Sequence, residues 1–353
     1  MKRIVILGLC ICFFCLYGCD SEYNDQVLPN DSTKTESSIV ESWGDSIQVN
    51  VTPEVPDKFD GKAYTYSAKQ RHFNKEEVMN YFLGNSEDVK EIYDNIFSFD
   101  NSILNLERGL TYSSNNSSLF TMFFDEYNCP EMKDLSFSPL STAEEKIREF
   151  AKKMDINLVL LKAYSMDRTY IANMISEYTP DLQLGEPTQQ QLRDQFNELG
   201  ECYVFFFEQS LDDIPVAGIT YVTKDDSVVD GGLVSAYLCA SGIVKFSIDY
   251  AYQVEPNDHP ITVVSPEQAL KVVRNKFENI IITNNIAINS MRLCYYPIIT
   301  DSAKKTYNLV PAWDISYSYD VQEAVDEDIL QKYQEVYGQH IYINAEDGSE
   351  IVI

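Results

Sequence analysis

Basic residues and histidines are scarce in this chain of 353 residues. It has 27 Lys and Arg against 55 Asp and Glu, and its formal net charge is −28. Little positive charge is left to neutralise phosphate groups, which argues against a nucleic-acid partner. The three histidines, His72, His259 and His340, stand far apart and offer little material for imidazole catalysis. We therefore expect no nucleic-acid binding, no metal centre and no cofactor.

Sequence motifs of common catalytic chemistry are also missing. The chain contains no H-E-x-x-H pair, no G-x-S-x-G nucleophile elbow and no Walker-type phosphate loop. Acidic clusters such as Asp225-Asp226 lack the spacing of a calcium loop and are typical of solvated surface. The sequence therefore predicts a non-enzymatic protein without catalytic residues. Because 55 acids make some close pair unavoidable, a carboxylate-based envelope enzyme remains an alternative.

The N-terminus carries an apolar run that is short for a membrane span. Ile4–Leu16 follows Lys2 and Arg3 and has 13 residues, whereas a bilayer span needs about 20. The run ends in Leu16-Tyr17-Gly18-Cys19, which resembles a bacterial lipobox. This resemblance implies a signal peptide over 1–18, a lipid on Cys19 and a membrane-anchored protein on the extracytoplasmic side. An ordinary signal peptide with a chance cysteine is the alternative.

Four cysteines remain in the exported body: Cys129, Cys202, Cys239 and Cys294. Outside the cytoplasm they could form two disulfides, but no C-x-x-C spacing exists and the pairing cannot be derived from the sequence. Cys202 and Cys239 lie in apolar, strand-like runs. Buried free thiols are therefore the alternative.

Residues 19–62 have the composition of a disordered acidic tether. From residue 20 onward this segment holds ten acids, three lysines and few large apolar side chains, with Pro29, Pro53 and Pro56 as breakers. Such a segment buries too little surface to offset the entropy that ordering would cost. We expect it to hold the folded body away from the membrane.

From residue 63 the pattern becomes that of helices and paired strands. Asn74, Ser141, Thr188 and Ser265 are each followed three residues later by Glu or Gln, which predicts four helix starts. Between them lie strand-like runs joined by short turns, which indicate antiparallel pairing. These runs are 102–112, 119–126, 203–210, 216–223, 233–239, 244–252, 287–296, 306–319, 340–344 and 350–353. The prediction is an α+β fold with helices packed on antiparallel sheets, in blocks 63–135, 136–256 and 257–353.

Residues 321–337 interrupt the last block with apolar residues at helical spacing, among them Ile329 and Tyr333, and Gly338 is a plausible helix end. We expect an amphipathic helix that packs on the C-terminal sheet or faces a partner. Tyr333 is a candidate contact residue.

The runs at 203–218 and 233–250 resemble the central part of YycI-type and YycH-type regulatory proteins. The later series of SPEQAL, LVPAWDISY and IYINAEDGSEI is also similar to PepSY-like modules of exported bacterial proteins. The resemblance covers roughly 140–353. It implies two or three such blocks and an envelope protein that binds or regulates a sensor kinase or an exported peptidase. YycI-type proteins keep a transmembrane helix, which the lipobox here would replace.

Within this resemblance, Pro215, Pro311, Trp313 and Gly348 read as fold-building residues. Pro215 follows a short turn, and Pro311 suits the start or edge of a strand because no amide is needed there. Trp313 can fill the gap between sheet and helix, and Asp347-Gly348 predicts a tight turn. A solute-binding lipoprotein with a ligand cleft is a further alternative.

Overall fold

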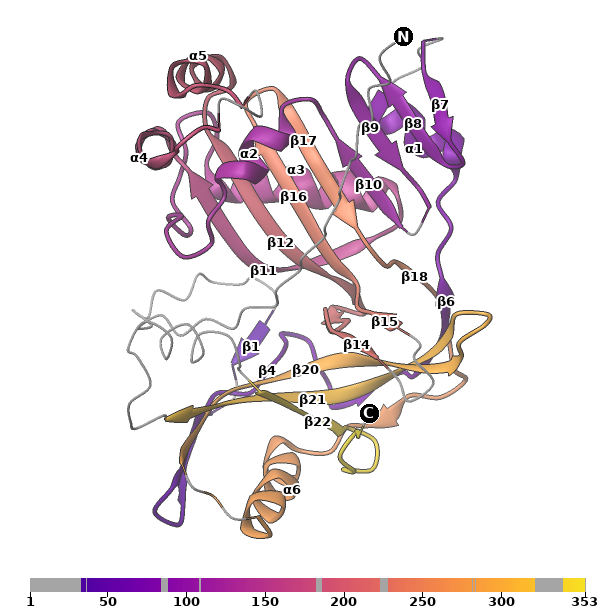
Figure 1. Ribbon diagram of the computed structural model, residues 1–353. Helices are drawn as coiled ribbons and strands as arrows, with labels where there is room; N and C mark the ends of the chain where they lie inside the picture. The colour runs from indigo at the N-terminus through magenta and orange to yellow at the C-terminus, as the bar shows by residue number, and fades with distance from the viewer. Residues whose placement is uncertain are drawn as a thin grey trace.

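The computed structural model describes residues 33–83, 88–181, 186–222, 228–320 and 339–352, without residues 36, 108, 281 and 283. In this part of the chain, two large β-sheets lie one above the other with helices packed on them (Figure 1). Strand outweighs helix, and the predicted α+β class is confirmed.

The lower sheet is built around a long antiparallel pair, β20 (Asn285–Asp301) and β21 (Thr306–Asp320). Two strands from the beginning of the described chain pair with β20 in parallel, so the sheet is mixed. Its other strands are β1 (Thr33–Thr35), β2 (Ile39–Trp43), β3 (Ile47–Val51), β4 (Glu54–Pro56), β6 (Tyr66–Gln70), β18 (Tyr252–Pro256) and β22 (Gln339–Asn344).

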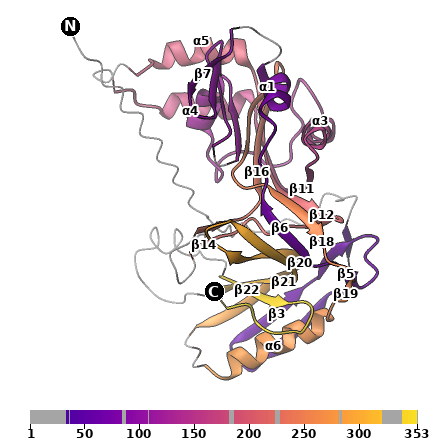
Figure 2. The same cartoon turned by 90° about the vertical axis from the view of Figure 1, so that its right-hand side faces the viewer.

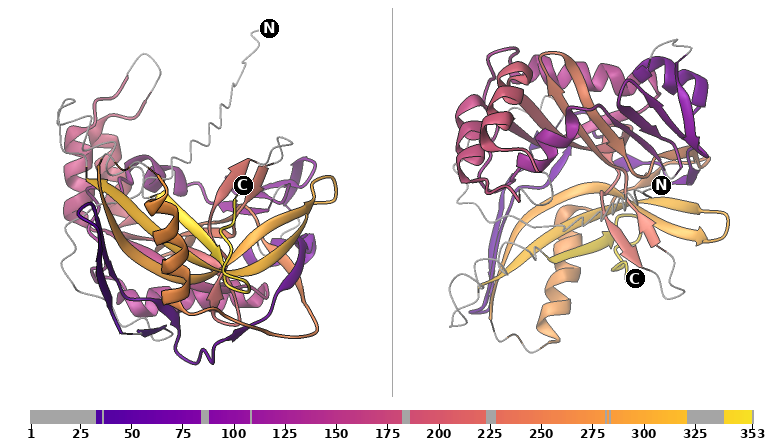
Figure 3. Two further views of the ribbon diagram at one scale, coloured as in Figure 1. Left: turned by 90° about the horizontal axis from the view of Figure 1, so that it is seen from below. Right: turned by 45° about the horizontal axis from the view of Figure 1, so that its top comes forward.

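Helix α6 (Pro266–Glu278) covers the outer face of the lower sheet (Figure 3). Ser265 accepts a hydrogen bond from the Gln268 amide, and Gln268 reaches back to the Ser265 amide, so the predicted capping box is present. Leu270, Val273 and Phe277 of the helix belong to the buried cluster of this sheet.

The upper sheet is antiparallel and carries helices on both faces (Figure 2). One face forms a core with α1 and α3, and the other forms a core with α2, α4 and α5. Its strands in spatial order are β11 (Asn157–Met166), β12 (Cys202–Leu211), β16 (Leu233–Cys239), β17 (Gly242–Ile248), β10 (Leu110–Ser113), β9 (Ser102–Asn105), β8 (Ile96–Phe99) and β7 (Lys90–Tyr93), with β13 (Ile214–Pro215) beside β12. The helices are α1 (Lys75–Leu83), α2 (Ser117–Phe123), α3 (Leu140–Lys153), α4 (Arg168–Glu177) and α5 (Gln189–Leu199).

Two small ribbons complete the described structure. They are β14 (Thr220–Val222) with β15 (Val228–Asp230), and β5 (Lys62–Ala63) with β19 (Ile261–Thr262). The lower sheet takes its strands from both ends of the described chain, whereas the upper sheet is formed by the stretch between them. The predicted boundaries at 135/136 and 256/257 therefore do not follow the sheets: the first of them divides the upper sheet.

The predicted disordered tether over 19–62 is wrong for residues 39–62. Strands β2, β3 and β4 lie there, and Trp43, Ile47, Val49 and Val55 are at most 5% exposed. The Ile-Gln-Val-Asn-Val alternation of β3 buries every second side chain, and β3 docks parallel to β20. The overall composition of residues 19–62 is polar, and it does not show that apolar and polar residues alternate within β3.

Other local predictions have mixed outcomes. The run 119–126, expected as a strand, overlaps α2, a helix that packs Phe120 and Phe123 into the core. Thr188 caps α5 with a capping box as predicted, but α3 starts at Leu140, before Ser141. The predicted helix at 321–337, Tyr333 and the segment 1–32 lie outside the described residues.

Candidate functional site

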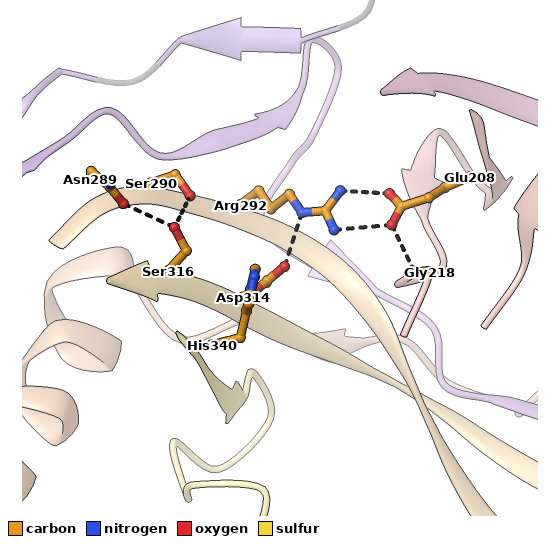
Figure 4. A network of polar contacts seen from close by, with 8 residues as sticks. All are labelled: Glu208, Gly218, Asn289, Ser290, Arg292, Asp314, Ser316 and His340. Atoms are coloured by element: carbon orange, nitrogen blue, oxygen red, sulfur yellow. Dashed lines mark hydrogen bonds and ion pairs between the residues drawn. The ribbon is translucent and has the colours of Figure 1, made fainter. Parts of the chain in front are cut away.

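A chain of ionic contacts joins the two sheets at a buried position (Figure 4). Arg292 on β20 donates from Nη1 to Glu208 Oε2 on β12 at 2.6 Å, and from Nη2 to Oε1 at 3.0 Å. Its Nε donates to Asp314 Oδ2 on β21 at 3.1 Å. Asp314 Oδ1 lies 2.6 Å from Nδ1 of His340 on β22. Both carboxylate side chains are only 2% exposed, so each depends on these partners rather than on water.

Strand alternation places these charges on the inner face of the lower sheet. Leu293 and Trp313 face each other in the β20–β21 register and pack in the α6 cluster. Arg292 and Asp314 form the adjacent pair in this register. Successive side chains of a strand point to opposite faces, so these two point to the face away from α6. There Arg292 meets Glu208 of the upper sheet, whose Oε1 also accepts a hydrogen bond from the Gly218 amide at 2.7 Å.

The acidity of Asp314 is set by two opposing effects. Burial would raise the pKa of this carboxyl group, but the hydrogen bond from His340 and the charge of Arg292 outweigh burial and hold the pKa below its ordinary value. One guanidinium lies between two carboxylates, and His340 Nδ1 supplies Asp314 with a second partner. The four side chains form a matched set at the junction of the sheets.

The His340–Asp314 pair has the geometry of a base with its orienting acid. Ser316 stands opposite His340 in the register, yet its hydroxyl group contacts Ser290 at 2.9 Å and Asn289 at 3.0 Å. Among the described residues, no hydroxyl group forms a hydrogen bond with His340. The contacts of this pair link β22 to β21 and, through Arg292, to Glu208 of the upper sheet.

A second feature is a groove of about 380 Å³ between strand β2 and helix α6. Three residues on one face of β2 form one wall, and one side of α6 forms the other. The lining residues are Ile39, Glu41, Trp43, Glu267, Leu270, Lys271, Arg274, Asn275 and Glu278. Trp43 Nε1 donates to Glu41 at 2.8 Å, and Arg274 pairs with Glu278 at 2.9 Å. The lining therefore combines three apolar side chains, Ile39, Trp43 and Leu270, with charged ones.

Strand β2 is an open edge among the described residues, because it pairs with β3 alone. The Ile286 amide of β20 donates to the Ser46 carbonyl at 2.7 Å, so the backbone groups of Ser46 face β20. Alternate residues of a strand direct their amide and carbonyl groups to the same side, so those of Gln48 also face β20. Ser42 of β2 lies opposite Gln48, whose backbone groups point away from β2, so the backbone groups of Ser42 also point away from β3. Val40 lies two residues before Ser42 and points its backbone groups in the same direction. The amide and carbonyl groups of Val40 and Ser42 therefore point outward beside the groove.

Trp313 and Pro311 occupy neighbouring positions of one face of β21. Trp313 is 1% exposed and donates from Nε1 to the Val264 carbonyl at 2.9 Å, beside α6. Pro311 lies inside β21 rather than at its start. It lies between Leu309, where the ladder with β6 ends, and Ala312, the end of the ladder with β22, and its carbonyl accepts a hydrogen bond from the Ala345 amide at 2.8 Å.

The other expected residues also lie at structural positions. Pro215 pairs with Ser210 in the short β12–β13 ladder. Gly348 has φ +75°, a conformation that favours glycine, and its amide donates to the Asn344 carbonyl at 2.9 Å. The predicted lipidation residue Cys19 lies outside the described residues.

The cysteines Cys129, Cys202, Cys239 and Cys294 are free thiols and buried, as the alternative to two disulfides expects. No helix in the described ranges is long and apolar enough to cross a lipid bilayer. Within the same ranges, no group of three or more His, Cys, Asp or Glu side chains is arranged to hold a metal ion.

Sequence reasoning missed the junction and the groove. A usable signal existed for the junction, because Glu208, Arg292 and Asp314 each lie next to a run of apolar residues within a strand. A charged residue in such a run requires a partner. The groove offered no comparable signal, because β2 was assigned to the tether.

Comparison with known proteins gives a likeness of fold. No protein-family model matches the chain, and no curated protein matches it. The fold is similar to the crystal structure of an uncharacterized protein from Eubacterium rectale, with a TM-score of 0.62 and 16% sequence identity. The match covers 90% of this chain and 93% of that one. At this identity the similarity concerns the fold alone.

Proposed function

We propose that this protein is a lipid-anchored extracytoplasmic protein that binds and regulates an envelope partner, such as a sensor kinase or an exported peptidase, without catalytic residues of its own. The lipobox-like ending at Cys19 supports the anchor. The resemblance of residues 140–353 to YycI-type and PepSY-like proteins supports regulation, and its blocks would correspond to parts of the two sheets.

The observation that carries the proposal is the open edge of β2 beside the groove. An extended segment of a partner can pair with the outward backbone groups of Val40 and Ser42, as in β-strand addition. Its alternate side chains would then enter the groove toward Trp43 and Leu270. Backbone pairing supplies affinity, and the groove supplies selectivity.

The charged residues of the groove indicate which kind of partner segment would bind there. The groove has three acids, Glu41, Glu267 and Glu278, against Lys271 and Arg274, and the whole chain carries −28. Electrostatic complementarity therefore favours a segment in which apolar side chains alternate with Lys or Arg. We propose such a segment of an envelope protein as the ligand of the groove.

The test is crosslinking in native membranes with a photoreactive residue at position 40 of the full-length protein. Position 93 serves as a control, because Tyr93 is 73% exposed on the upper sheet. We expect position 40 to capture one protein, and peptide sequencing to place the crosslink in an extended basic and apolar segment. Capture at position 93 but not at position 40 would contradict the proposed site.

A backbone variant then tests the mode of binding. Val40→Pro removes an outward amide that the fold does not use, and edge strands tolerate proline in that position. We expect affinity for the captured segment to fall at least tenfold, because a ladder hydrogen bond is lost and the ring obstructs pairing. Val40→Thr keeps the amide and should bind normally. Equal binding by both variants would rule out strand addition.

A further inference from the structure

Two cysteines lie directly opposite each other on neighbouring strands of the upper sheet. Cys202 begins β12 and Cys239 ends β16, and the antiparallel register pairs them. Their exposed fractions are 0% and 2%, and both side chains belong to the core that α2, α4 and α5 cover. The positions of both backbones are therefore fixed by the sheet.

The hydrogen-bond pattern shows what kind of pair they form. The Gln209 amide donates to the carbonyl of Gly232 opposite it at 3.0 Å, so these two residues are a hydrogen-bonded pair. The two kinds of pair alternate along an antiparallel ladder, and the register from Glu208 to Cys202 has no bulge. An odd number of steps separates Gln209 from Cys202. Cys202 and Cys239 are thus a non-hydrogen-bonded pair, the kind in which facing side chains approach most closely.

This geometry suits a covalent link. Cα atoms of a non-hydrogen-bonded pair lie about 4.5 Å apart, and disulfides span Cα separations of roughly 4.4–6.8 Å. We propose that Cys202 and Cys239 form an intramolecular disulfide by exchange with a disulfide oxidant such as oxidised glutathione. The two thiols give up two protons and two electrons as the Sγ–Sγ bond forms, and the oxidant's sulfur–sulfur bond breaks to yield two thiols. This inference does not depend on the proposed partner.

Two other cysteines help to define the specificity of the link. Cys294 lies on the lower sheet in a different buried cluster, so it is out of reach. Cys129 belongs to the same cluster as the pair and is the competing partner. However, Cys129 lies in the segment after α2, where its amide is bonded to the Asp125 carbonyl at 2.9 Å, and no ladder register holds it opposite another cysteine.

The position of the pair also sets how oxidation proceeds. Cys239 is followed by the exposed turn residues Ala240 and Ser241, so opening the last rung of the ladder admits an oxidant. Burial raises the pKa of the Cys202 thiol, which keeps the reactive thiolate scarce in the folded state. We expect slow oxidation of the folded protein that accelerates with rising pH, and faster oxidation during refolding.

The experiment starts from reduced full-length protein incubated with oxidised glutathione. After unfolding, the remaining thiols are blocked with N-ethylmaleimide and the digest is mapped by mass spectrometry. We expect one linked pair of peptides, containing Cys202 and Cys239, with Cys129 and Cys294 alkylated. Oxidation should raise the melting temperature by several degrees, because the link constrains the unfolded chain. Alkylation of both Cys202 and Cys239, glutathione retained on either cysteine, or a link to Cys129 would overturn the proposal.

Matched variants separate the link from general effects of oxidation. Cys202→Ser and Cys239→Ser should each abolish the linked peptide and the rise in melting temperature, whereas Cys294→Ser should keep both. If the first two variants fail to fold, the peptide map of Cys294→Ser still decides the question. In that variant, absence of the Cys202–Cys239 peptide would contradict the inference.

Discussion

At the level of single residues, the junction between the sheets depends on Arg292. Glu208 and Asp314 are buried, and the guanidinium lies between them with three hydrogen bonds. An ion pair of this kind adds modest net stability when complete, because desolvation opposes the Coulomb attraction. Removing one member has a much larger effect, since the remaining charges stay buried without a partner.

Replacing Arg292 with Ala should therefore lower the free energy of unfolding by about 3–5 kcal/mol. Arg274→Ala is the matched control: its ion pair with Glu278 is about half exposed, and its loss should cost less than about 1 kcal/mol. Urea denaturation of the two variants measures the difference. Equal losses would mean that the buried network does not carry the junction.

The same network determines how the fold responds to acid. The folded pKa of Asp314 lies below its unfolded value of about 3.9. Its carboxylate therefore contributes stability that is fully present above that value and is lost as the pH falls through the folded pKa. His340→Ala removes a hydrogen bond that lowers this pKa, so acid unfolding should begin at a higher pH. Circular dichroism against pH measures the midpoint, which the exposed control His72→Ala should leave in place.

At the level of elements, the hairpin of β2 and β3 contributes to the core although its surroundings are polar. Trp43 is 5% exposed and joins the cluster beneath α6, whereas Val40 on the other face is 72% exposed. Trp43→Ala should lower the free energy of unfolding by about 3–5 kcal/mol. Val40→Ala should stay within about 0.5 kcal/mol. A negligible effect of Trp43→Ala in chemical denaturation would show that the hairpin is not part of the cooperative fold.

Elements with local signals were the ones that sequence reasoning could predict. The capping boxes at Thr188 and Ser265 lie within four residues, and both are present. The partners at the junction and the parallel docking of β3 on β20 depend on residues far apart in the chain. Periodicity states which face of a strand is buried, but it does not state which distant strand covers that face. The groove follows from that docking, so it could not be predicted either.

At the level of the whole molecule, the excess of acidic residues sets a repulsion that opposes compactness. A net charge of −28 destabilises the folded state through like-charge repulsion. Raising the salt concentration from about 0.01 M to about 0.1 M shortens the screening length from about 30 Å to about 10 Å. The melting temperature should therefore rise over this range. Changing the exposed acids Asp100, Glu145 and Glu198 to amides should reduce the rise, and an unchanged salt response in that variant would contradict the explanation.

The interleaved topology of the lower sheet has a consequence for the order of events during synthesis. Ile47 of β3 pairs with Ile286, so the earliest strands cannot complete their sheet until β20 and β21 have been made. The upper sheet draws on residues 90–248 and can close before that point. During synthesis from the N-terminus, the apolar face of the β2–β3 hairpin therefore stays uncovered while the upper sheet folds. That interval is when a chaperone or a neighbouring chain has its best opportunity to bind them.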